Sequence, residues 1–134
     1  MAVRYFTPEE ANEALETVRP LAEELVEHRR ALREAATRRA ELARVVAGNG
    51  GGVDARELAA LDEEATREAA EITELVSRIQ ELGVLVKDLD RGLVDFPARR
   101  GDEDVLLCWE VGEDEIAFWH GVEEGFAGRK PLPL

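Results

Sequence analysis

The feature that most constrains this fold is a change in the spacing of apolar residues at Gly83. Before Gly83 they recur every three or four residues, as in packed helices, and after it they alternate, as in β-strands. We therefore predict an α+β protein: a long antiparallel helical hairpin, coiled-coil-like, over residues 7–82, then a small four-stranded antiparallel β-meander over residues 83–120 and an irregular tail over 121–134. At 134 residues the chain, 1–134, is expected to form a single domain.

The first predicted helix begins at a capping box, in which Thr7 is the cap, Pro8 takes the first helical position and Glu10 closes the box. Pro20 lies inside the pattern and should kink or divide the helix. A glycine-rich loop at 47–53 ends it. The two heptad positions that carry the apolar pattern are occupied by Ala11, Val18, Leu25, Leu32, Arg39 and Val46, and by Ala14, Leu21, His28, Ala35 and Leu42.

The second predicted helix begins at Asp54, which forms a capping box with Glu57, and ends at Gly83. Because the loop is short, the helices must be antiparallel, and residues whose numbers sum to about 100, such as Leu25 and Leu75, should face each other. Its heptad positions hold Leu58, Ala65, Ile72 and Ile79, and Leu61, Glu68, Leu75 and Leu82.

Two helices that pack only on each other bury only one side of each helix, so the hairpin needs a second surface to pack against. The apolar stripe is also wider than the two-position seam of a coiled coil, because it includes Leu15, Val26, Val45, Leu61 and Val76. We expect a homodimer that forms a four-helix bundle. His28 on the seam is expected to hydrogen-bond a glutamate near residue 72, and the alternative is a pH-sensitive pair of His28 side chains across the dimer axis.

Four short strands are predicted at 84–88, 93–98, 104–111 and 115–120. Side chains alternate between the faces of a strand, which assigns one face to the core and the other to the outside. The predicted core face holds Val94, Phe96, Val105, Leu107, Trp109, Val111, Ile116 and Phe118, and the other face holds Asp95, Leu106, Cys108, Glu110, Ala117 and Trp119. On this alternation His120 falls on the core side, opposite the single cysteine.

The residues whose side chains are best suited to bind a metal lie in or beside these strands. Asp88, Asp95, Cys108 and His120 are candidate metal ligands, because zinc and iron accept carboxylates, thiolates and imidazoles. The predicted faces of Cys108 and His120 argue against such a site, and no CxxC or HxxxH spacing supports it. The alternative is structural: Cys108 packs as a small apolar residue, His120 binds a carboxylate such as Glu123 or Glu124, and Asp88 stabilises a turn.

Two further candidate binding residues are Glu113 and Arg129. Arg129 lies beside glycines in the tail, so the segment from Gly125 to Arg129 is a candidate site for a small anion held by backbone N–H groups. The structural alternative pairs Arg129 with an acidic neighbour, for which Asp95 is the first choice.

The charge excludes several classes of partner. Against 17 lysines and arginines stand 30 aspartates and glutamates, a net charge of −13, so we expect neither nucleic acid nor an anionic membrane as a partner. One cysteine excludes an intramolecular disulfide, and no stretch approaches the ~18 apolar residues of a membrane span or forms a signal peptide. These features predict a cytoplasmic protein.

Three phrases of the sequence are similar to a known family. "RYFTPEEAN" near the start, "GVLVKDLDRGLVDFPARR" in the middle and "LLCWEVGEDEIAFWHGVEEGFAGRKPL" at the end resemble the bacterial domain of unknown function 2203 family. The family elements GLVDF, CW, GE, WH and GR stand here at Gly92–Phe96, Cys108–Trp109, Gly112–Glu113, Trp119–His120 and Gly128–Arg129. The resemblance implies the same architecture and assigns no activity, ligand or catalytic residue.

Taken together, these patterns favour a non-enzymatic interaction or scaffolding module that oligomerises through its helices and presents the sheet and tail to a protein partner. We assign no catalytic residue, leave the cofactor open and do not expect a divalent metal. The alternative is a metal-binding or metal-dependent protein, with a divalent metal held by the Asp, Cys, Glu and His residues of the C-terminal sheet.

Overall fold

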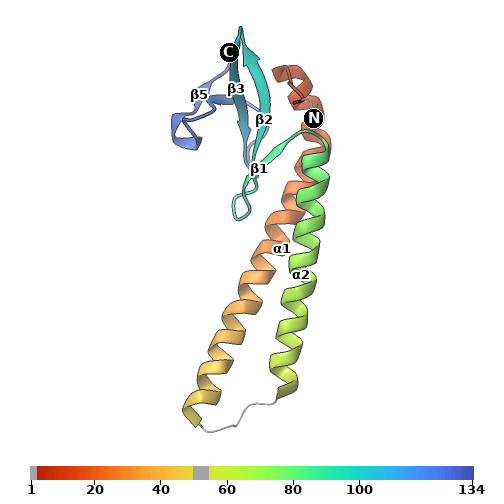
Figure 1. Ribbon diagram of the computed structural model, residues 1–134, viewed down its shortest axis with the longest axis vertical. Helices are drawn as coiled ribbons and strands as arrows, with labels where there is room; N and C mark the ends of the chain where they lie inside the picture. The colour runs from red at the N-terminus through yellow and green to blue at the C-terminus, as the bar shows by residue number, and fades with distance from the viewer. Residues whose placement is uncertain (1–2, 50–54) are drawn as a thin grey trace.

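The computed structural model describes residues 3–49 and 55–134 of the chain. Two long helices, α1 (Pro8–Asn49) and α2 (Ala55–Glu81), run side by side and antiparallel, and a small sheet lies at the end of the hairpin that carries the N-terminus (Figure 1). The predicted α+β fold, a helical hairpin followed by an antiparallel sheet, is confirmed. Within the described residues neither helix is long and apolar enough to cross a membrane.

The sheet has five strands in sequence order, and every neighbouring pair is antiparallel. The strands are β1 (Leu85–Asp88), β2 (Leu93–Arg100), β3 (Glu103–Trp109), β4 (Phe118–Gly121) and β5 (Lys130–Pro131). The prediction of four strands and an irregular tail needs correction, because the tail forms a 3-10 turn, η1 (Phe126–Gly128), and then adds β5 to the edge of β4.

The start of α1 is the predicted capping box. The backbone N–H of Glu10 donates to the hydroxyl of Thr7, and the N–H of Thr7 donates back to the Glu10 carboxylate. Pro20 does not divide the helix, which continues to Asn49 and so extends into the predicted loop. The first turns of α1, red in Figure 1, are inclined to the rest of the helix. The remainder of the loop and the predicted cap Asp54 lie outside the described residues.

The predicted register of the hairpin is confirmed by one hydrogen bond and one ion pair between the helices. His28 Nδ1 lies 2.5 Å from Glu68 Oε2, and Arg39 bonds Asp62, so the paired numbers sum to about 100 in both cases. The glutamate contact expected for His28 is therefore present, on α2 of the same chain.

The hydrophobic core lies where the hairpin meets the sheet. It combines the first turns of α1, the last turns of α2 and the inner face of the sheet, including Trp109 and Phe96. Phe6 anchors the N-terminal segment: its ring meets Phe96 edge-on at 5.3 Å, and its N–H donates to the Pro97 carbonyl at 2.7 Å. The sheet therefore packs against the open end of the hairpin.

Candidate functional site

The candidate site lies on the outer face of the sheet, the face turned away from the helices. In the register of β2 and β3, Asp95 stands directly opposite Cys108, as the alternation predicts. Both side chains are almost fully buried, at 2% and 1% exposure. The cover comes from the C-terminal tail, blue in Figure 1, which lies on the side of the sheet away from the helices.

The predicted orientation of the last core strand is wrong. Phe118 pairs with Cys108 and His120 with Leu106, so Phe118 and His120 both lie on the outer face, while Trp119 turns into the core. The regular strand β4 begins only at Phe118, and residues 110–117 are irregular. The alternation of side chains between the two faces therefore cannot be followed through this segment. The prediction that His120 and Cys108 lie on opposite faces of the sheet is wrong for this reason.

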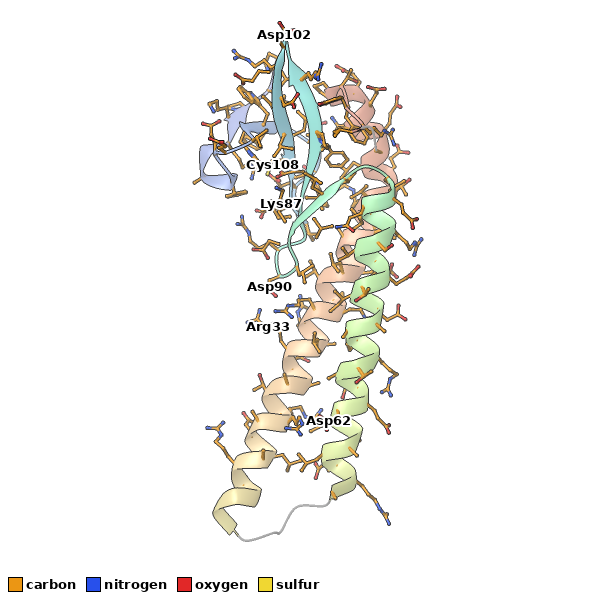
Figure 2. All side chains as sticks on the ribbon, in the orientation of Figure 1. Arg33, Asp62, Lys87, Asp90, Asp102 and Cys108 are labelled. Atoms are coloured by element: carbon orange, nitrogen blue, oxygen red, sulfur yellow. The ribbon has the colours of Figure 1, made fainter. Side chains whose placement is uncertain are left out.

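As a result, three of the four predicted metal ligands meet. One ligand atom each from Asp95, Cys108 and His120 lies within 4.8 Å of the others, and all three residues are buried. Figure 2 shows Cys108 within the sheet, with Lys87 nearby. The Lys87 ammonium is 3.9 Å from Asp95 Oδ2, a neighbour that the sequence analysis missed although the alternation of β1 signalled it.

The two ring nitrogens of His120 have different partners. Nδ1 lies 2.8 Å from the carbonyl oxygen of Gly121, an atom that only accepts, so Nδ1 carries the hydrogen. In the neutral ring Nε2 then presents a lone pair, yet its neighbour at 3.2 Å is the carboxylate oxygen Oδ1 of Asp95. Two acceptors do not bond each other, so this contact requires either an additional proton or a cation.

The thiol of Cys108 is strongly held in its protonated form. Burial, followed by the negative charge of Asp95, raises the pKa of Cys108 from 9.0 to about 12. The positive charge of Arg129 acts in the opposite direction. A thiol with such a pKa is a poor nucleophile at neutral pH, because the thiolate is the reactive form. A metal ion at the site would change this balance by taking the place of the proton.

The remaining candidates, Asp88, Glu113 and Arg129, do not belong to the group of possible metal ligands. Asp88 accepts hydrogen bonds from the backbone N–H groups of Asp90 and Arg91, which is the structural turn role of the alternative hypothesis. Arg129 pairs with an acidic residue, as the structural alternative predicts, but its partner is Glu113 and not Asp95. The carboxylate bound by His120 is Asp95 rather than Glu123 or Glu124.

Comparison with known proteins identifies the family. The model of the family described as "Uncharacterized conserved protein (DUF2203)" matches residues 4–132, so the chain belongs to that family. Comparisons with curated proteins and with solved structures found no match.

Proposed function

We propose that this protein binds a divalent transition metal of the zinc class through Asp95, Cys108 and His120. The observation that carries the proposal is the contact between His120 Nε2 and Asp95 Oδ1 at 3.2 Å, beside a buried thiol. The backbone carbonyl of Gly121 fixes the hydrogen on Nδ1 and so points the lone pair of Nε2 at the other two ligands. Metal-binding histidines are oriented by this kind of second hydrogen bond.

The spacing of the ligand atoms fits a metal of this size. In a tetrahedral zinc site, bonds of about 2.0–2.3 Å place neighbouring ligand atoms about 3.3–3.8 Å apart. The Nε2–Oδ1 distance of 3.2 Å is close to this range, and the 4.8 Å limit on the other ligand distances leaves only small side-chain movements to be made. One sulfur, one nitrogen and one oxygen ligand suit zinc, cobalt or iron and not magnesium or calcium.

The chemistry of the buried groups also supports a metal. A thiol, an imidazole and a carboxylate that meet in a dry environment must share protons to avoid unpaired charge. A divalent cation would replace those protons and would leave Asp95 and Cys108 ionised with their charge neutralised. We place the protein in the cytoplasm, where a reducing environment keeps the thiol available.

The test is a metal titration of the purified, metal-free protein. We expect one equivalent of Zn²⁺ to bind in competition with a chromophoric chelator, and Co²⁺ to give a tetrahedral spectrum with a thiolate charge-transfer band. The near-isosteric substitutions Asp95→Asn, Cys108→Ser and His120→Gln should each weaken binding about 100-fold or more, because each removes one of three ligands.

Asp102→Asn is the matched control, because Asp102 is an exposed aspartate at the tip of the β2–β3 hairpin, far from Cys108 in Figure 2. Circular dichroism of each metal-free variant would establish that it folds. If the wild type binds no equivalent of Zn²⁺ under this competition, or if Asp102→Asn weakens binding as much as the ligand variants do, the proposal fails.

The other hypothesis, a non-enzymatic module that assembles through its helices, concerns a different part of the molecule. It is compatible with a metal in the sheet and stays a prediction. The tail already pairs with the edge of β4 and lies on the side of the sheet away from the helices (Figure 1), so a protein partner on that side would have to contact the tail itself.

A further inference from the structure

Arg129 is held in an unusually fixed position beside the candidate metal site. Its guanidinium lies 4.0 Å from the ring centroid of Phe118 and 4.6 Å from that of Phe126, and one amino group binds the Glu113 carboxylate. The side chain is only 12% exposed. Stacking on two rings and a charged hydrogen bond together restrict a side chain that is otherwise among the most mobile.

One donor of this guanidinium has no acceptor. The Nε–H group is buried, and within the described part of the chain no oxygen or nitrogen accepts its hydrogen bond. A buried N–H of a charged group that lacks a partner is costly, so proteins rarely retain one without a role. The carboxylate of Glu113 accepts from Nη2 of Arg129, and the Nε–H stays without an acceptor among the described residues.

The register of the sheet brings the guanidinium of Arg129 close to the cluster. Phe118, on which Arg129 stacks, pairs directly with Cys108 across β3 and β4. Side chains directly opposite on one face of a sheet are about 5 Å apart at Cβ.

We propose that the metal bound by Asp95, Cys108 and His120 takes a small monovalent anion as its fourth ligand, and that the Arg129 side chain binds this anion. The inference rests on the proposed metal-binding function. Tetrahedral zinc with three protein ligands keeps one position for an exogenous group.

The local charges favour an anion in that position. A divalent metal would be balanced by Asp95 and Cys108, and Arg129 is balanced by Glu113, so among these described groups the Lys87 ammonium near Asp95 would add one positive charge. Because all three ligand residues are only 1–2% exposed, the anion must be small, such as hydroxide, azide or formate, and inorganic phosphate should be excluded.

The test uses the Co²⁺-loaded protein, whose spectrum reports on the fourth ligand. Titration with azide and with formate should shift the Co²⁺ bands at saturable concentrations, and phosphate should leave them unchanged. In Arg129→Gln the azide dissociation constant should rise about tenfold, as expected from loss of a hydrogen bond to a charged group, while the affinity for Co²⁺ changes less.

Arg91→Gln is the matched control. Arg91 also stacks on Phe126, at 4.0 Å, and also binds a glutamate, Glu110, so its removal likewise loses a ring contact and an ion pair without touching the unpaired Nε–H. Azide binding should be unchanged in this variant. A thiolate charge-transfer band with no response to azide or formate would overturn the inference and leave the metal site intact. If the protein binds no Co²⁺, the proposed function and this inference both fail.

Discussion

At the scale of single residues, burial decides what Cys108 does. On a surface this thiol would be partly ionised near neutral pH and open to oxidation, but here it is 1% exposed and lies against the Asp95 carboxylate. The same burial that suppresses its reactivity makes it a good ligand for a cation, because little water competes for the site. Asp95 and His120, at 2% exposure each, are the only charged or polar residues that the described structure buries to this degree.

The raised pKa of Cys108 predicts that the metal-free protein loses stability in alkaline solution. The pKa rises from 9.0 to about 12, so the folded protein holds the thiol proton more tightly than the unfolded chain does. This contribution to stability is complete below about pH 9 and is lost as the pH rises through about 12, at up to about 1.4 kcal/mol per pH unit.

Urea unfolding at about pH 8 and about pH 10, with a chelator present, would measure this loss, because the difference between the two free energies isolates the titrating groups. Cys108→Ala serves as the reference, since it lacks the thiol and keeps a small apolar side chain. We expect the wild type to lose more stability than this variant between the two pH values. Equal losses would show that the thiol does not titrate in this range.

At the scale of elements, Gly92 fixes how the turn between β1 and β2 meets the helix and the end of β3. Its φ is +62°, and a Cβ there would lie 2.5 Å from Val111 Cγ2 and 2.9 Å from Val26 Cγ2. Gly101, in the next turn, has nearly the same φ of +63° but no described atom within 4 Å of its would-be Cβ. The two glycines therefore separate backbone strain from steric overlap.

We expect Gly101→Ala to lower the free energy of unfolding by about 1 kcal/mol, through backbone strain alone. Gly92→Ala should lower it by about 2–4 kcal/mol, because overpacking against two valines adds to the same strain. Chemical denaturation of both variants would give the two values. Equal destabilisation would mean that the contacts with Val26 and Val111 relax without cost.

The elements also show which inferences the sequence supports. The helices, their register and the pairing of Asp95 with Cys108 follow from local periods and short connections, and all three were predictable. The position of His120 was not, because the irregular residues 110–117 interrupt the alternation on which the prediction depended. The pairing of β5 with β4 was also missed, since two residues in a segment rich in glycine and proline carry no periodic signal.

At the scale of the whole molecule, the stabilising contacts are concentrated at one end. The hydrophobic core joins the sheet to the proximal turns of both helices. In the distal arm, defined here as residues 33–49 and 55–68, Ala35 and Leu61 are the only buried apolar side chains among those described. Two helices that bury so little are marginal alone, since most helical stability comes from packing of an amphipathic face.

The thinness of this arm underlies our prediction of a homodimer. A groove of about 210 Å³ runs between the helices of the arm, with Leu42, Val45 and Leu61 among its lining residues, and Val45 is 49% exposed. The same groove of a second copy would cover these apolar side chains and complete a four-helix bundle. Light scattering coupled to size exclusion should then give about twice the chain mass of 14.9 kDa.

Val45→Glu should weaken this dimer about tenfold or more, because it would bury an unpaired carboxylate in an apolar interface. Val122→Glu is the matched control, since Val122 is also an exposed valine, at 58%, and lies in the tail at the other end of the molecule. Only the first substitution should shift the measured mass towards the monomer and make the melting temperature depend more strongly on concentration. A wild-type protein that stays monomeric at high concentration would show that the distal arm is stable without a partner.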